Sequence, residues 1–302
     1  MKIINFGSLN IDNVYRVDRL VLSGNTIDSK GYKVFSGGKG LNQSVALSKA
    51  GVSEVYHAGN IGMNGEILMY TLLEHGINTD FIKRSSCKTG HAVIQVADNA
   101  EHTIIVHGGS NHNNDIEFID KVLKEFQAGD VLLLQNEINN VGYIIDVAYE
   151  KGLVIILNPA PANAKILEYD LSKIDTLIVN ESELYQCART NNLNEAIEIL
   201  RQKGINLLLT LGCKGGIYYS KDSKEYKYLA YKVDEVDTTA IGDAFVGYFV
   251  AGITKYNDMT MILDLSSRAA ALTATKMGAS NSIPALEEVL SFIEKGNDFY
   301  ED

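Results

Sequence analysis

The chain has 302 residues, of which 46% are hydrophobic, and it carries a formal net charge of −11. This length and apolar content suffice for one large α/β domain, or for one domain with a small appendage. The acidic balance argues against nucleic-acid binding, and the sequence contains no Lys/Arg cluster with interleaved aromatic residues.

Short apolar runs alternate with amphipathic stretches along most of the chain. The runs typical of buried parallel strands are KIINFG, VYHAGN, DVLLLQ, GLVIILN, DTLIVN and INLLLTLG. Helical spacing is found over residues 42–50, 116–126, 141–150 and 193–202. The alternation predicts a three-layer α/β/α sandwich around a mostly parallel sheet, in which ligands bind at the carboxyl ends of the strands.

Two pairs of segments alternate apolar and polar residues with a period of two. NVYRVDRL precedes SKGYKVFS, and GHAVIQVAD precedes EHTIIVHG across a turn-like DNA. This pattern is typical of antiparallel strands with one solvated face, so we expect a small sheet that forms a lid. The predicted core covers residues 1–11, 36–88 and 108–302, and the predicted lid covers residues 12–35 and 89–107. A later run, YYSKDSKEYKYLAYKVDE, predicts a solvated hairpin with its charges and tyrosines outside.

The cysteine pattern and the apolar runs bear on location. Cys87, Cys187 and Cys213 lack C-x-x-C spacing, which favours a reducing compartment over a disulfide scaffold. A membrane span needs about 18 consecutive apolar residues, and the sequence has no such run. We therefore expect a cytoplasmic protein without a membrane partner.

Polar clusters follow several of the predicted strands, and each has a purely structural alternative. In GSLNID, Asn10 and Asp12 could bind the hydroxyls of a small polyol or cap a turn. Glu137 follows the strand DVLLLQ and either meets solvent or joins a pocket. In LIVNESEL, Asn180 could cap a helix and Glu183 could complete a capping box. The glycine-rich turn in LLLTLGCKGG could simply lead into a hairpin.

Two further stretches place glycines at a predicted helix start. FSGGKGLNQSVALSKAG contains neither the G-x-x-x-x-G-K-[ST] loop nor the G-x-G-x-x-G fingerprint, which removes the two commonest nucleotide motifs. DTTAIGDAF feeds the apolar run AFVGYFVAGI, as a turn before a helix does. Its Asp243 would stand at a helix N-terminus, where a carboxylate can act beside an anion held by free backbone N–H groups.

Together these motifs resemble the ribokinase family of PfkB-type sugar kinases. The signature regions appear as GGKGLNQSVAL and DTTAIGDAFVGYFV, and GSLNID, NPAPA, NESE, TLGCKG and GASNSIP follow the family's order. The resemblance implies ATP-dependent transfer of phosphate to a sugar hydroxyl, with the O5 hydroxyl of D-ribose favoured. Fructose, a deoxyribose or a nucleoside are alternative acceptors, and a non-catalytic sugar-binding regulator is the alternative outside enzymology.

The resemblance also implies roles for individual residues. Asp243 would be the catalytic base, and the backbone of Ala240, Ile241, Gly242 and Asp243 would form an anion hole. The implied sugar contacts are Asn10, Asp12, Gly38, Lys39, Asn42, Glu137 and Asp243. The implied nucleotide contacts are Asn180, Glu183, Thr210, Gly212, Gly215 and Ser267.

Two kinds of metal ion and a subunit partner are implied as well. Asn180 and Glu183 would hold Mg²⁺ through water and phosphate. A monovalent cation such as K⁺ would lie near Asp237, Thr239, Thr273, Lys276, Gly278 and Ser282. Pairing of lid sheets would form a homodimer. The sequence departs from the family at Ile241, usually alanine, at SGNT, usually PGET, and at Ser267, often histidine.

Overall fold

The larger of two sheets forms the centre of the molecule. The computed structural model describes residues 1–99 and 101–292. Nine strands lie in the order β13-β12-β11-β10-β9-β8-β1-β4-β5. Their bounds are β1 (Ile3–Phe6), β4 (Val55–Ile61), β5 (Asn78–Arg84), β8 (Val131–Gln135), β9 (Val154–Asn158), β10 (Thr176–Asn180), β11 (Asn206–Thr210), β12 (Gly216–Tyr219) and β13 (Glu225–Tyr228). Neighbours from β5 to β11 pair in parallel, and β12 and β13 pair antiparallel at one edge.

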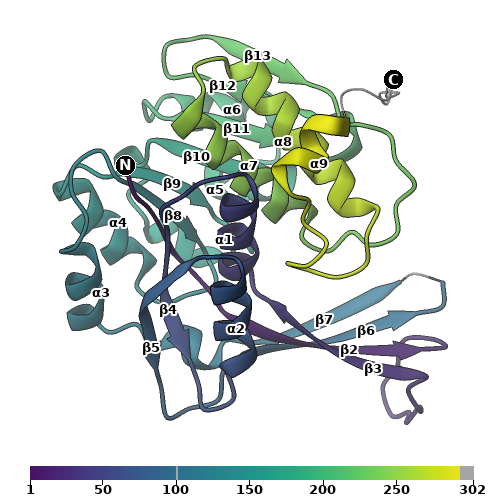
Figure 1. Ribbon diagram of the computed structural model, residues 1–302. Coiled ribbons are helices and arrows are strands. Elements are labelled where there is room, and N and C mark those ends of the chain that lie inside the picture. Colours follow the sequence, from purple (N-terminus) through teal and green to yellow (C-terminus); the bar gives the residue numbers. More distant parts are fainter. Residues whose placement is uncertain (100, 293–302) are drawn as a thin grey trace.

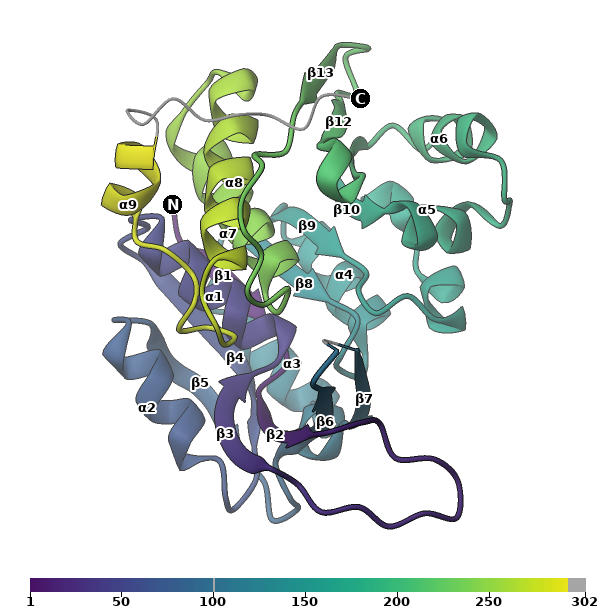
Figure 2. The same ribbon diagram turned by 90° about the vertical axis from the view of Figure 1, so that its right-hand side faces the viewer.

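Helices cover both faces of this sheet (Figures 1 and 2). One face carries α1 (Lys39–Lys49), α2 (Glu66–Glu74), α7 (Ile241–Lys255), α8 (Met259–Ala274) and α9 (Leu286–Ser291). The other carries α3 (Ile116–Leu123), α4 (Val141–Glu150), α5 (Glu181–Ala188) and α6 (Leu193–Arg201). Successive residues of a strand point to opposite faces, so β8 contributes Leu133 to the first core and Leu132 and Leu134 to the second.

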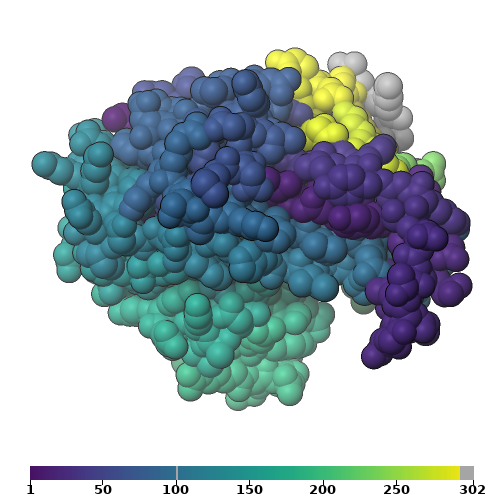
Figure 3. Space-filling model, turned by 90° about the horizontal axis from the view of Figure 1, so that it is seen from below, coloured from purple at the N-terminus to yellow at the C-terminus, as the bar shows by residue number. Residues whose placement is uncertain are grey.

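A second sheet of four strands projects from the core. Its order is β3-β2-β6-β7, with β2 (Asn10–Val17), β3 (Gly31–Gly37), β6 (Gly90–Ala97) and β7 (His102–His107). The hairpin pairs β2·β3 and β6·β7 are antiparallel, whereas β2 and β6 are parallel. Seen from below, the purple N-terminal part of this sheet extends past the body of the molecule (Figure 3). The predicted fold class, an α/β sandwich with a small second sheet, is confirmed.

Several element bounds differ from those expected. The helix expected over 42–50 begins at Lys39, because Gly38 has φ 90° and starts the helix directly after β3. Strand β2 begins at Asn10 and β3 ends at Gly37, so the second sheet reaches further into the core than residues 12–35. The expectation of outward tyrosines was wrong for Tyr218, Tyr219 and Tyr231, which are buried. Across residues 1–99 and 101–292, no helix is long and apolar enough to cross a membrane.

Candidate active site

Strand ends and helix starts enclose a cavity of about 470 Å³ at one edge of the large sheet. The expected residues among its lining are Lys39, Asn180, Glu183, Thr210, Gly212, Gly215, Ala240, Ile241, Gly242, Asp243 and Ser267. They come from α1, β10, α5, β11, α7, α8 and the loop after β11. Residues far apart in the sequence therefore meet at the carboxyl end of the sheet, where ligands bind in folds of this class.

Helix α7 presents Asp243 to this cavity. Ala240 precedes the helix with φ 61° and no side-chain cap, and Asp243 lies in the first turn. The first N–H groups of an α-helix have no partner within the helix, so the amides of Ile241, Gly242 and Asp243 are available to an anion. Asp243 is only 7% exposed. The arrangement can hold a negatively charged group next to a buried carboxylate.

Two amides of α1 fix the orientation of the Asp243 carboxylate. Asn42 Nδ2 donates to Asp243 Oδ2 at 2.9 Å, and Gln43 Nε2 donates to Asp243 Oδ1 at 2.9 Å. Gln43 is fully buried, and its own amide is held by Gln135 Nε2 at 2.7 Å and by Asn158 Oδ1 at 3.0 Å. Both carboxylate oxygens thus have fixed donors, and the network behind them extends into the protein interior.

The residues expected on the sugar side lie beside this cavity. Glu137 accepts hydrogen bonds from Ser8 Oγ and from the backbone N–H of Lys39, the latter at 2.9 Å, at the point where Gly38 leads into α1. Asn10 Oδ1 accepts from Asn111 Nδ2 at 2.7 Å. These contacts bring the loop after β1, the loop after β8 and the start of α1 together.

Carboxylates dominate the electrostatics of the site. Burial, with Glu137 and Asp243 nearby, raises the pKa of Asp12 to about 7. Burial also raises the pKa of Glu137 and of Glu183 above its usual range. Asp243 is the main reason why the pKa of Lys39 lies above its ordinary value, so this half-buried ammonium stays charged. One cation therefore faces an excess of negative charge.

On the expected nucleotide side, the capping reading of Asn180 and Glu183 is confirmed. Glu183 N donates to Asn180 Oδ1 at 2.9 Å, and Asn180 N donates to Glu183 Oε2 at 3.0 Å. Both residues also line the cavity, and among the described residues Glu183 Oε1 and the Asn180 amide nitrogen have no hydrogen-bond partner. Gly212 and Gly215 have φ 62° and 79°, which glycine adopts without strain. Ser267 Oγ donates to Leu229 O at 2.8 Å.

The residues expected to bind a monovalent cation form two local groups. Asp237 accepts from Thr239 N at 2.9 Å, from Thr239 Oγ1 at 2.6 Å and from Gly278 N at 2.9 Å. Thr273 Oγ1 donates to Ala269 O at 2.8 Å and Ser282 Oγ to Ala279 O at 2.7 Å, while Lys276 Nζ pairs with Glu288. Carboxylate oxygens are ligands that hard cations prefer, and the Asp237 carboxylate here is bonded by two backbone N–H groups and one hydroxyl. In the part of the chain that the structure describes, no group of three His, Cys, Asp or Glu side chains could hold a metal.

Sequence reasoning missed several residues of the site. Gln43, Asn158 and the tyrosines of the edge hairpin were not assigned to it, yet Asn158, Tyr228 and Tyr231 line the cavity. Gln43 lies inside the GGKGLNQS motif and Asn158 begins the NPAPA motif, and these motifs were the available signals. The sequence contains no such signal for the tyrosines, because their contact with the cavity depends on how the hairpin packs against α7 and α8.

Comparison with known proteins gives a consistent result along the whole chain. Residues 1–286 match the profile of the pfkB family carbohydrate kinases. A ribokinase of Haemophilus influenzae is 33% identical over 300 residues, which cover 95% of this chain and 97% of that protein. A deoxyribokinase of Salmonella typhi is 29% identical over 307 residues, which cover 97% and 99%. A solved ribokinase of Cryptococcus neoformans in complex with ADP superposes with a TM-score of 0.82 at 29% identity, covering 96% of this chain and 99% of that one. The chain belongs to the pfkB family of carbohydrate kinases.

Proposed function

We propose that this protein is an ATP-dependent ribokinase that transfers the γ-phosphate of ATP to the O5 hydroxyl of D-ribose. The observation that carries the proposal is the buried Asp243 carboxylate, oriented by two amides at a helix N-terminus. The glycine-rich turn and the Asn180/Glu183 pair line the same cavity as Asp243, Asn42 donates to Asp243, and Glu137 accepts from the backbone of Lys39 at the cavity. The ribokinase relatives at 33% and 29% identity support ribose as the acceptor.

In the proposed reaction, Asp243 accepts the proton of the sugar hydroxyl as it attacks the γ-phosphate. Positioned general bases contribute about 10²–10⁴-fold to rate. The free amides of Ile241, Gly242 and Asp243 stabilise the charge that develops on the transferred group. Phosphoryl transfer depends mainly on positioning and charge stabilisation, so this small set of groups suffices.

The sugar would be held by Asn10, Asp12, Asn42, Lys39 and Glu137. These side chains offer both donors and acceptors, which suits a molecule with several hydroxyls. A site built to bond particular hydroxyls rejects analogues that lack them, because its own polar groups are then left unpaired. This reasoning favours ribose over 2-deoxyribose, the acceptor class named for the Salmonella typhi relative.

Two cations complete the proposal. The site's excess of carboxylates opposes a polyphosphate, so a divalent ion such as Mg²⁺ would supply charge neutralisation when bound. Asn180 and Glu183 would hold it through water and phosphate. Asn180 Oδ1 and Glu183 Oε2 already accept hydrogen bonds in the capping box, so they are not free to bind the ion directly. A K⁺ ion near Asp237 would order the loop of residues 237–240 that leads into the anion-binding amides.

The second sheet would act as a lid and as a dimer contact. Its edge strand β7 is exposed along its whole length, and Ile104, Ile105 and Val106 are more than half exposed. Edge strands with exposed apolar residues are prone to pair with another chain. Closure over the sugar would exclude water and limit ATP hydrolysis. We further propose a homodimer through these sheets and a cytoplasmic location.

The test is a coupled ADP-release assay with ATP, Mg²⁺ and K⁺ across ribose, 2-deoxyribose, fructose, ribulose, tagatose, adenosine and pseudouridine. We expect the kcat/KM for ribose to exceed that of every other compound by at least about a hundredfold, since a site whose polar groups lose their partners can discriminate by about 10⁴-fold or more. A preference for 2-deoxyribose would assign the chain to the other acceptor class. Absence of turnover with measurable ribose binding would replace the kinase proposal by a non-catalytic regulator.

A further inference from the structure

Asn111 links the return from the second sheet to the loop after β1. It belongs to the 3₁₀ turn Gly109–His112, which follows β7 and leads the chain back to the core. It is 1% exposed. Its Oδ1 accepts from Leu9 N at 2.9 Å, and its Nδ2 donates to Asn10 Oδ1 at 2.7 Å. Asn111 thus holds Asn10, one of the side chains that would bind the sugar.

The hydrogen bonds of Asn111 have a fixed direction. The backbone N–H of Leu9 can only donate, so the atom of the Asn111 amide that faces it is the oxygen. The Asn111 nitrogen then faces Asn10, where only the amide oxygen can accept from it. The nitrogen of Asn10 is therefore turned away from Asn111. This nitrogen donates to no described residue, and protein does not enclose it completely, so a ligand can reach it.

Glycine at position 90 makes room for this contact. Gly90 lies opposite Asn10 in the register of β2 and β6. A Cβ atom at Gly90 would lie 2.2 Å from Asn111 Nδ2, 2.4 Å from Asn10 Oδ1 and 2.8 Å from Gly108 O. Gly90 is not among the glycines with positive φ, so its backbone conformation does not call for glycine. The close approach of the two amides does.

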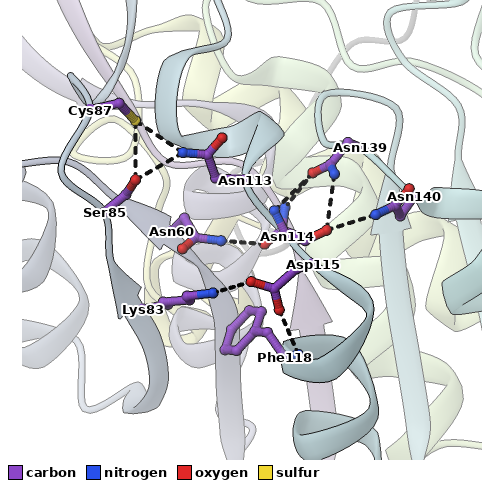
Figure 4. Close-up of polar contacts among 10 residues, drawn as sticks. All are labelled: Asn60, Lys83, Ser85, Cys87, Asn113, Asn114, Asp115, Phe118, Asn139 and Asn140. Atoms are coloured by element: carbon purple, nitrogen blue, oxygen red, sulfur yellow. Dashed lines mark hydrogen bonds and ion pairs between the residues drawn. The ribbon is translucent and has the colours of Figure 1, made fainter.

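The turn that carries Asn111 is anchored to the large sheet through Asn114. Asn114 Nδ2 donates to Asn111 O at 2.8 Å, and its Oδ1 accepts from Asn60 Nδ2 of β4 at 2.6 Å. Asn139 Nδ2 and Asn140 Nδ2, before α4, donate to Asn114 O at 2.9 Å and 2.7 Å (Figure 4). Asn111 therefore acts from a rigid support, as a residue that orients another must.

A donor at Asn10 complements the carboxylates of the proposed sugar site. Asn10 and Asp12 lie on the same face of β2, and Asp12 is within electrostatic range of Glu137 and Asp243. A sugar hydroxyl that donates to a carboxylate keeps lone pairs on its oxygen that can accept. Asn10 Nδ2 supplies a donor for such an oxygen. Turned the other way, the amide would add one more acceptor to a site that already has an excess of them.

We propose that Asn111 is a positioning residue of the sugar site, which holds the Asn10 amide with its nitrogen toward the sugar. This role rests on the proposed sugar kinase function and deepens it. Asn111 does not touch the substrate and acts only through Asn10.

Asn111→Asp is the decisive variant, because it keeps the shape of the side chain and removes its donor. One carboxylate oxygen still accepts from Leu9 N. The other can only accept, so Asn10 has to turn its nitrogen inward and its oxygen toward the sugar. Asn111→Ala removes the support without reversing it. Asn10→Asp keeps the bond from Asn111 Nδ2 and also presents an oxygen to the sugar, so it tests the same exchange if Asn111→Asp does not fold.

The assay measures kcat and KM for the sugar and for ATP, using the sugar that the unaltered enzyme prefers. Calorimetry of the full-length chain without nucleotide gives the dissociation constant of the same sugar independently of turnover. Asn113→Asp is the matched control. It makes the same change two residues away, at an exposed side chain that contacts Ser85 and Cys87 (Figure 4).

We expect Asn111→Asp to raise both KM and the dissociation constant for the sugar by about 10–100-fold, the loss caused by one unpaired polar group. The kcat and the KM for ATP should stay within about threefold, as for a group that contributes to sugar binding alone. Asn10→Asp should match this result, and Asn113→Asp should behave as the unaltered chain does. Asn111→Ala should have a smaller effect than Asn111→Asp, whereas a merely structural role predicts the opposite order. In a chain that carries Asn10→Ala, adding Asn111→Asp should change sugar affinity by less than about twofold, because the group it acts through is gone.

A sugar KM of folded Asn111→Asp within about twofold of the unaltered value would overturn the positioning role and leave the kinase proposal standing. An unchanged sugar KM in Asn10→Asp, a larger effect of Asn111→Ala, or a full effect of Asn111→Asp in the Asn10→Ala chain would do the same. An unaltered chain that neither binds nor phosphorylates any sugar of the panel would overturn both proposals.

Discussion

Replacing Gln43 with leucine should separate the positioning of the proposed catalytic carboxylate, Asp243, from substrate binding. Gln43 Nε2 donates to Asp243 Oδ1 at 2.9 Å from a fully buried position. Leucine has a similar size but no donor, so Asp243 would keep only the hydrogen bond from Asn42. The carboxylate would then be free to turn about that single contact.

The expected magnitude follows from the bonds that are lost. A hydrogen bond to a charged group contributes about 1.5–3 kcal/mol. If that energy holds Asp243 in the reactive orientation, kcat should fall about 10–150-fold. Asn158 Oδ1 also loses its donor, and a buried acceptor without a partner costs about 1–3 kcal/mol of stability. Gln135 retains a partner in Asn5 Oδ1 at 2.9 Å, so it adds little to this cost.

The assay measures kcat and KM for sugar and for ATP, together with thermal unfolding. We expect kcat to fall while KM for ATP changes less than twofold, because the residues of the expected nucleotide side are untouched. Ser48→Ala is the control, since it removes a hydrogen bond of α1 to His75 O at 2.6 Å without touching Asp243. A folded Gln43→Leu enzyme with kcat within about twofold of the unaltered enzyme would refute the positioning role, because the bond at stake is worth about tenfold or more.

Four further outcomes follow from the same site. Asp243→Asn should lower kcat by about 10²–10⁴-fold while sugar binding persists in calorimetry, and near-normal turnover would remove Asp243 from the base role. Glu137→Ala should raise KM for sugar far more than KM for ATP, and the reverse would relocate the sugar site. Replacing K⁺ with Na⁺ should lower kcat if a cation orders the loop at Asp237, and equal rates would contradict that site. The pKa of Asp12, about 7 against 3.8 for an unfolded chain, means that its contribution to stability is present below about pH 4 and lost as pH rises through 7. Denaturant unfolding should therefore show Asp12→Asn gaining stability over the unaltered chain between about pH 4 and pH 8, by up to about 4 kcal/mol, whereas a constant difference would contradict this.

The polar residues that follow the strands were predictable from the sequence, because the apolar runs of β1, β8 and β10 end at Phe6, Gln135 and Asn180. A strand that is buried on both faces must end where polar residues begin, and parallel strands end at one edge of their sheet. Strand positions and the location of the cavity therefore followed from local patterns. The strand register and the contacts of individual side chains did not.

Gln43 shows why the remaining side-chain contacts could not be predicted from the sequence. Its partners Asn158 and Asp243 lie 115 and 200 residues away, and no local pattern relates them. Helix α1 is buried from Gly40 to Leu47, so its polar residues have the same burial as its apolar ones and show no solvated face. The prediction that the tyrosines of the edge hairpin face solvent was wrong for a related reason. Tyr218 packs against Phe249 of α7, while Tyr219 lies under the guanidinium of Arg201 of α6, so both faces of the strand are covered.

Close packing of α1 on α7 connects the two signature motifs. Gly247 lies within α7, where glycine costs about 1 kcal/mol relative to alanine. A Cβ atom at Gly247 would clash with the side chain of Ala46 on α1, so glycine permits the two helices to approach. Asp243 precedes Gly247 by one turn on the same face of α7, and Asn42 precedes Ala46 by one turn on α1. The close approach at 46 and 247 therefore sets the 2.9 Å contact between Asn42 and Asp243, and the position of the proposed base depends on both motifs at once.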